Sequence, residues 1–273
     1  MRGARLAIAL ACSLVIARPT AAATLHEFSH PPIAVQFHPR GDRRFQVSDL
    51  ERALLLGVSA AELDLRWRDA DSSVVCAHDR RDVNAAPTLA AALDMLFGFQ
   101  GERQTVQGDG LQFFLVLDLK DERPAFHRAL VRALADRAAH WASSGSPTLH
   151  PRGITVLISG FRAALERSIP PAALDTLCIV EGRDYGPRVR VQGGPARFQW
   201  LAVDDPVDRG RVRDLHEGRD PRARGRFNVR VVGAGSHLKR DVAAGADAVN
   251  ADLEEIPSAI RVVRASAESK RRP

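Results

Sequence analysis

Two acidic residues interrupt an apolar, strand-like run in the first third of the chain. Glu62 and Asp64 stand two positions apart in AAELDLRW (60–67). Side chains at alternate positions of a β-strand point to the same face, so these two carboxylates should lie side by side. Because burying an unpaired carboxylate is costly, two neighbouring ones need a compensating partner. A histidine, His78, ends the next apolar run, SVVCAH (73–78).

Polar residues also stand at the ends of two other apolar runs. Asp118 and Lys120 are two positions apart at the end of LQFFLVLDLK (111–120), the most hydrophobic run in the chain. His38 ends IAVQFH (33–38) and precedes the turn sequence PRGD. Each of these residues alone would more often be structural, as a hydrogen-bonded histidine or an ion pair. Their recurrence at the ends of separate runs favours one shared site.

Three carboxylates that converge on one place repel each other unless a cation lies between them. We therefore expect Glu62, Asp64 and Asp118 to bind a hard divalent cation, Mg²⁺ or Ca²⁺, since these ions prefer oxygen ligands. Zinc is less favoured, because the pattern contains no cluster of thiolates or histidines. The hypothesis is a metal site at the ends of these strands.

A metal site flanked by two histidines would suit the cleavage of a phosphodiester. His38 and His78 are the candidate general base and general acid. Lys120 would offset charge on the phosphate. Glu181 ends a strand-like run and Arg230 lies within another, so both are candidates for substrate contact. For these two a structural role stays open, as a cap of the next segment for Glu181 and as the partner of an acid for Arg230.

Short apolar runs alternate with longer helical patterns along most of the chain. The expected strands are 33–38, 60–67, 73–78, 111–120, 153–159, 176–182, 198–205, 227–233 and 246–252. The expected helices are 48–57, 88–99, 125–142, 161–169 and 236–245. Ser48 is expected to cap the first helix, and Gly57 to end it. The alternation is typical of βα units built around a parallel sheet.

The number of candidate strands is one more than an eight-stranded barrel needs. Because the link between 60–67 and 73–78 is too short for a helix, these two runs should form a local excursion or a hairpin. The remaining pattern predicts an α/β fold, a single-domain (β/α)₈ TIM barrel, whose reactive groups lie where strands meet the following loops. A doubly wound open sheet is the alternative, but VVGAGSHL (231–238) is the nearest approach to its glycine-rich turn.

The first 23 residues read as a targeting segment. Arg2 and Arg5 precede the apolar LAIALACSLVIA, and PTAAAT then offers an Ala-x-Ala type cleavage site after about Ala23. The apolar run is too short for a membrane-spanning helix. We therefore expect a signal peptide (1–23), a mature barrel (24–273), and export to the periplasm or the medium.

Composition and charge narrow the classes of partner. The chain is 45% hydrophobic and 26% charged, which is typical of a soluble globular protein. Removing the signal peptide removes three arginines and no acid, so the formal charge falls from +6 to +3. Because the remaining arginines are scattered, nucleic-acid binding is not expected. A mildly positive surface suits a small-molecule or lipid phosphodiester and leaves open a peripheral membrane contact. Cys76 and Cys178 could form a disulfide or stay as buried free thiols.

Three stretches resemble one known group of enzymes. AAELDLRWRDADSSVVCAHD (60–79) resembles the ELD…HD block of the glycerophosphodiester phosphodiesterase and phospholipase-C-like phosphodiesterase superfamily. FFLVLDLK (113–120) is similar to that superfamily's acid-x-Lys strand, and GADAVNADLEEI (245–256) to its closing strand. Within the superfamily, the closest resemblance is to the branch of the altered-inheritance-of-mitochondria protein six. Spider-venom sphingomyelinase D proteins are a more distant match.

The resemblance implies a (β/α)₈ barrel, a Mg²⁺ or Ca²⁺ site and phosphoric diester hydrolysis. The residues that match the superfamily's motifs are His38 and His78 as the acid–base pair, Glu62, Asp64 and Asp118 as metal ligands, and Lys120 as a phosphate contact. The chain departs from the usual His-Arg-Gly motif, since Pro39 follows the histidine. Two alternatives therefore stay open: a catalytically silent barrel that binds a ligand or partner, and a lyase that forms a cyclic phosphate.

Overall fold

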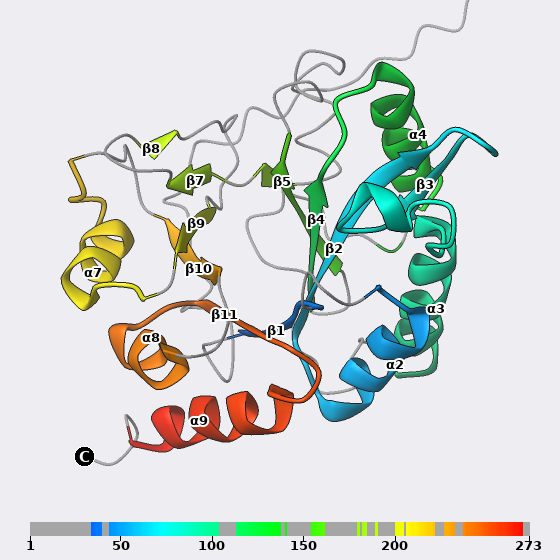
Figure 1. The fold of residues 1–273 in the computed structure, drawn as a ribbon. Helices are drawn as coiled ribbons and strands as arrows, with labels where there is room; N and C mark the ends of the chain where they lie inside the picture. Colours follow the sequence, from blue (N-terminus) through cyan, green and yellow to red (C-terminus); the bar gives the residue numbers. More distant parts are fainter. Residues whose placement is uncertain are drawn as a thin grey trace, which may run out of the picture.

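A curled, mainly parallel β-sheet forms the centre of the molecule (Figure 1). The computed structural model describes residues 34–39, 44–103, 113–137, 140, 154–161, 179–180, 182–184, 189–190, 200–204, 206–221, 227–232 and 237–269. Across the sheet, the strands follow the order β6 (Ile179–Val180), β5 (Ile154–Gly160), β4 (Phe113–Leu119), β2 (Ala60–Arg68), β1 (Ala34–Phe37), β11 (Ala248–Ala251), β10 (Asn228–Val232), β9 (Trp200–Asp204), β7 (Gly182–Asp184) and β8 (Val189–Arg190). Each of the nine expected runs contains a strand.

Seven neighbouring strands, from β5 through to β9, are all parallel. Together they form a curled half-barrel with helices on its outer side, as Figure 1 shows. Parallel strands end at the same edge of their sheet, so the residues at their carboxyl ends gather on one rim. The α/β class with a parallel sheet is thus confirmed.

The expected hairpin is present between β2 and β3 (Ser73–Cys76). The two strands pair antiparallel, with Leu65 opposite Cys76. Ser72 has a φ of 55° in the tight turn that joins them. Beyond β3, the amide of Ala77 donates to the carbonyl of Asp64 at 2.8 Å. The hairpin therefore brings the start of the following loop, including His78, back to the acidic part of β2.

The helices within the described residues are α2 (Val47–Leu56), α3 (Leu89–Arg103), α4 (Pro124–Ala135), α7 (Arg209–Glu217), α8 (Leu238–Ala244) and α9 (Ile256–Ser269), with a short 3₁₀ helix η1 (Arg80–Asp82). As expected, α2 ends at Gly57, whose φ of 95° favours glycine. The expected cap at Ser48 is wrong, because α2 begins one residue earlier and Gln46 occupies the N-cap position. Apart from Phe161, the helix expected over 161–169 lies outside the described residues.

Apolar side chains fill the space between the sheet and the helices. All seven residues of β4 are buried, as in a strand that is covered on both faces. Cys76 is a buried free thiol, and burial raises the pKa of that thiol, whereas Cys178 lies outside the described residues. In the part of the chain that is described, no helix is both long enough and apolar enough to cross a membrane.

Candidate active site

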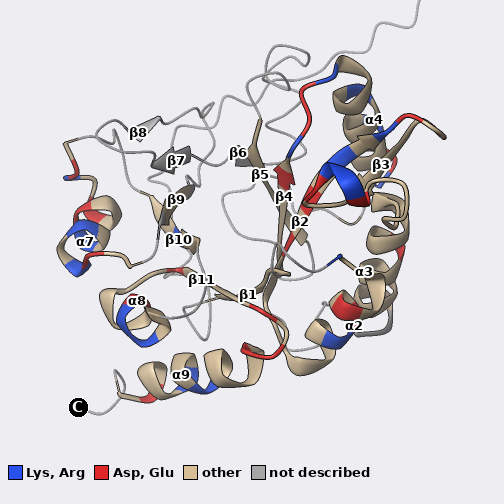
Figure 2. Cartoon of the chain, in the orientation of Figure 1, with Lys and Arg blue, Asp and Glu red and all other residues tan. Residues whose placement is uncertain are grey.

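Acidic side chains lie inside the otherwise apolar sheet, on the two central strands β2 and β4. Figure 2 shows them as red segments on strands that are mostly tan. Parallel pairing places Asp64 directly opposite Asp118. Glu62, Asp64 and Asp118 are only 3%, 5% and 4% exposed. The register therefore brings the three predicted metal ligands into one buried region near the rim.

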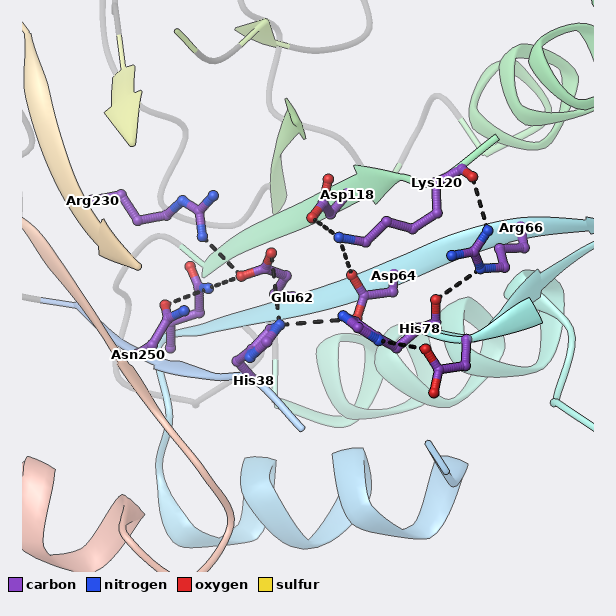
Figure 3. Close-up of polar contacts among 11 residues, drawn as sticks. His38, Glu62, Asp64, Arg66, His78, Asp118, Lys120, Arg230 and Asn250 are labelled. Atoms are coloured by element: carbon purple, nitrogen blue, oxygen red, sulfur yellow. Dashed lines mark hydrogen bonds and ion pairs between the residues drawn. The ribbon is translucent and has the colours of Figure 1, made fainter. Parts of the chain in front are cut away.

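Lys120 joins two of these acids. Its Nζ lies 2.6 Å from Asp118 Oδ2 and 3.2 Å from Asp64 Oδ1 (Figure 3). Burial lowers the pKa of the ammonium group, but the charges of Asp118 and Asp64 outweigh this effect and raise it overall. Lys120 is thus a fixed cation that balances part of the charge of the acids.

The third acid, Glu62, has its own buried cation. Arg230 on β10 is 1% exposed, and its Nη1 lies 2.8 Å from Glu62 Oε2. The same oxygen accepts a hydrogen bond of 2.6 Å from Nε2 of Gln36, which also donates to Asn250 Oδ1 at 2.7 Å. Burial alone would raise the pKa of Glu62, but the charge of Arg230, followed by that of His38, lowers it overall. Glu62 is therefore held as a carboxylate.

His38 stands at the end of β1, beside the acids. Its amide donates to the carbonyl of Ala251 at 3.0 Å, which continues the pairing with β11. Its Nε2 lies 3.9 Å from Glu62 Oε1 and 3.9 Å from Asp64 Oδ2. One ligand atom from each of these three residues lies within 4.8 Å of the others, so the group could hold a metal ion.

The donor set fits a hard divalent cation. Lys120 and Arg230 offset two of the three carboxylate charges, which leaves an excess of negative charge for a cation to balance. Asp118 Oδ1 is buried and has no hydrogen-bond partner among the described residues. Carboxylate oxygens with a free coordination position are the ligands that Mg²⁺ and Ca²⁺ prefer. Asp118 Oδ2 accepts from Lys120, and its Oδ1 lies beside Gly160 at the end of β5. Asp118 is therefore not part of the converging group, in which His38 joins Glu62 and Asp64.

The second predicted histidine lies at the outer side of this group. His78 has a 43% exposed side chain, and its Nδ1 lies 3.2 Å from Asp79 Oδ1. Arg66 fixes the backbone here, because its Nε donates to the His78 carbonyl at 2.8 Å. Arg66 Nη1 donates to the Lys120 carbonyl at 3.0 Å. The two loops that carry His78 and Lys120 are thus tied to the end of β2.

Sequence reasoning missed three polar residues that support the site. Arg66 continues the alternation of Glu62 and Asp64 on β2. The spacing alone could therefore have predicted that its side chain lies on the same face of the strand. Gln36 and Asn250 are opposite each other in neighbouring parallel strands. Each is a polar residue within an apolar strand, the same signal that drew attention to the acids. Glu181, the remaining predicted substrate contact, lies outside the described residues.

No protein-family model and no curated protein matches the chain. Among solved structures, the calcium-dependent phosphoinositol-specific phospholipase C of a Gram-negative Pseudomonas covers 81% of this chain and 89% of its own, with a TM-score of 0.52 and 12% identity. This likeness shows that the two chains share a fold. PLC21 of L. pealei covers 81% of this chain and 33% of its own, with a TM-score of 0.51 and 10% identity.

A glycerophosphoryl diester phosphodiesterase domain from Mycobacterium tuberculosis covers 84% of this chain and 98% of its own, with a TM-score of 0.49 and 13% identity. At identities this low, structural likeness shows a shared fold rather than a shared reaction. The two phospholipase C structures with TM-scores above 0.5 therefore confirm the expectation at the level of the fold alone. The reaction has to be argued from the residues of the site.

Proposed function

We propose that the chain is a metal-dependent phosphoric diester hydrolase that acts on a glycerophosphodiester or phospholipid-type diester. The observation that carries the proposal is the group of His38, Glu62 and Asp64, which could hold a metal ion. Beside it lie Asp118, paired with Lys120, and the fixed cation Arg230. Such a group binds both a divalent cation and the negative charge of a phosphate. Within the phosphodiesterase superfamily, Asp118 followed two residues later by Lys120 supports the branch of the altered-inheritance-of-mitochondria protein six.

Under this proposal the sheet closes into a single-domain (β/α)₈ barrel. β6 pairs with β5, while β7 pairs with β9, and only one residue separates β6 from β7. We propose that β6 and β7 together join the two edges of the half-barrel. Glu181 lies outside the described residues, and we assign it to substrate binding, together with Lys120, from the sequence alone.

We assign the metal to Glu62 and Asp64, and to Asp118 from the sequence pattern alone. When bound, Mg²⁺ or Ca²⁺ would neutralise charge on the non-bridging oxygens of the diester. Lys120 Nζ, which faces Asp64 and Asp118, would contact the same phosphate. The buried Arg230 would act mainly by keeping Glu62 ionised and in place.

We assign proton transfer to the two histidines. His38 Nε2, next to Glu62 and Asp64, would take the proton from the attacking hydroxyl. His78, which is more exposed and orientated by Asp79, would protonate the leaving oxygen.

We further propose that residues 1–23 are a signal peptide and that the mature protein is exported.

The test is hydrolysis of a panel of glycerophosphodiesters by the mature chain, followed by phosphorus NMR. We expect His38→Ala and His78→Ala to lower kcat/KM by about 100- to 10,000-fold, the usual range for a general acid or base. His140→Ala is the matched control, since His140 stacks on Phe97 of α3, outside the rim. If both active-site variants cleaved the panel as fast as the parent, the proposal would be wrong. A cyclic product in the NMR spectrum would indicate the lyase reaction instead.

A further inference from the structure

A cavity of about 790 Å³ lies beside the proposed active site. Its wall is built from the end of β2, the loop after β3, the start of the β4–α4 connection and the end of β5. The lining residues are Arg66, Trp67, Asp69, Ala70, Arg80, Val83, Asn84, Lys120, Asp121, Glu122, Arg123, Pro124 and Phe161. Lys120 belongs both to this wall and to the site, so the cavity adjoins the place where the scissile phosphate would bind. A volume of this size suits a small ligand.

Two of the acids in the wall are already engaged by one arginine. Arg123 Nη2 lies 2.6 Å from Asp121 Oδ2, and Arg123 Nη1 lies 2.8 Å from Asp69 Oδ2. The third acid, Glu122, is exposed to solvent. Arg123 is therefore the direct ion-pair partner of both Asp121 and Asp69.

Two arginines in the wall have no carboxylate partner in the described structure. The half-buried Arg66 donates to the His78 and Lys120 carbonyls at 2.8 and 3.0 Å, contacts that orient the guanidinium without neutralising it. Arg80, the first residue of η1, has an exposed side chain that forms no ion pair with any other described residue. The pKa of Arg66 is lowered by burial and then by the nearby charge of Arg80. The nearby charges of Asp121, Asp64 and Asp79 act in the opposite direction. Two neighbouring guanidinium groups thus face one cavity, and neither forms a direct ion pair with a described carboxylate.

Apolar side chains complete the wall. Phe161 is 52% exposed at the end of β5, while Trp67 is buried at the end of β2. An exposed phenylalanine next to oriented guanidinium groups can cover the carbon skeleton of a ligand whose anionic end meets the arginines. Asn84 adds an amide to the polar part of the wall.

We propose that this cavity binds a phosphomonoester carried by the alcohol portion of the substrate, with Arg66 and Arg80 as its contacts. The proposal rests on the proposed function, because it treats the cavity as an extension of a phosphodiesterase site. Two guanidinium groups match a phosphate dianion, which accepts several charge-assisted hydrogen bonds at once. The preferred substrates are then diesters with a second, distal phosphate, in place of diesters with neutral or cationic head groups.

The test compares two diesters that differ in one phosphate: glycerophosphoglycerol and the same molecule with a terminal phosphomonoester. We expect the parent to prefer the phosphorylated diester by about tenfold or more in kcat/KM, the gain typical of one charge-assisted hydrogen bond. Arg80→Gln should remove most of this preference and leave cleavage of the unphosphorylated diester unchanged. Arg81→Gln is the matched control, because Arg81 is 73% exposed, pairs with Asp79 and does not line the cavity.

A second measurement does not depend on turnover. Calorimetric titration of the parent with inorganic phosphate should give an affinity that Arg80→Gln weakens by about tenfold and Arg81→Gln leaves intact. Equal losses in the two variants, or no preference of the parent for the phosphorylated diester, would overturn the proposal. Equal preference for a diester with a terminal carboxylate would also overturn it, since the assignment is to a phosphate dianion.

The two proposals can fail separately. If neither diester were cleaved but phosphate binding still depended on Arg80 and not on Arg81, the proposed hydrolase would fall and the anion site would stand. If both diesters were cleaved at equal rates, the hydrolase would stand and the second phosphate site would fall.

Discussion

The buried pair of Arg230 and Glu62 makes the sharpest prediction about stability. Their side chains are 1% and 4% exposed, and the contact between them is 2.8 Å long. Replacing Arg230 with Met keeps most of the side-chain volume but leaves a buried carboxylate without its cation. Two unit charges about 4 Å apart attract each other by about 4 kcal/mol at the effective dielectric constant of protein sites. Broken buried pairs cost about 3–5 kcal/mol, so we expect Arg230→Met to lower the free energy of unfolding by that amount.

The matched double variant separates lost attraction from lost packing. In Glu62→Gln/Arg230→Met both charges are gone, so the free energy of unfolding should recover by about 2 kcal/mol or more relative to Arg230→Met. The assay is urea unfolding at pH 7, followed by far-UV circular dichroism. A chelator is present throughout, because a bound cation would itself neutralise Glu62. A loss below about 1 kcal/mol in Arg230→Met, or strictly additive losses in the double variant, would refute the reasoning.

Three further predictions concern the rim and its surroundings. Mg²⁺ or Ca²⁺ at about 100 times its Kd should raise the free energy of unfolding by about 2.7 kcal/mol. A thermal melt should show this stabilisation in the parent and not in Asp64→Asn. Gly160→Ala should lower the free energy of unfolding by about 1–3 kcal/mol, as measured by urea unfolding. Gly160 has a φ of 76°, and an added Cβ would collide with Asp118 Oδ1.

The third of these predictions is a pH dependence. Burial raises the pKa of Asp121, but hydrogen bonds from Arg123 lower it overall from its usual 3.8. The contribution of the pair is therefore present above pH 3.8 and lost as the pH falls through the lowered pKa. Because Arg123 is 45% exposed, the deficit of Arg123→Met should be at most about 1 kcal/mol at pH 7. Urea titrations should show this deficit shrinking below pH 3.8, and a deficit that did not change with pH would contradict the prediction.

Local patterns in the sequence were enough to predict the strands and several element ends. The run 113–119 is apolar at every position except Asp118, so no neighbouring segment has to be known to recognise a buried strand. Gly57 ends its helix because a φ of 95° is accessible to glycine at little cost. The antiparallel pairing of β2 and β3 followed from the length of the link between them. Two parallel strands would need a crossover helix, and the link is too short to hold one.

Two helices were missed for a physical reason. Residues 209–217 are strongly charged and bury only Val212 and Leu215, so the helical period is carried by very few apolar residues. Residues 256–269 bury Ile256, Ala259 and Val263, which follow a helical spacing. The apolar side of this helix is hard to recognise in the sequence, because the side chains that form it are few and partly small. Both helices are held by packing against neighbouring elements, and that packing does not appear in a local window of sequence.

The types of residue in the site were readable from the sequence, but their partners were not. Alternation along β2 already placed Glu62 and Asp64 on one face. The contact of Glu62 with Arg230 joins residues 168 positions apart, and the register of β2 with β4 decides that Asp64 faces Asp118. The curl of the sheet brings strands from distant parts of the chain together. Which charged side chains of the rim form ion pairs, and that Arg66 instead donates to the backbone carbonyls of His78 and Lys120, is therefore decided by the tertiary structure.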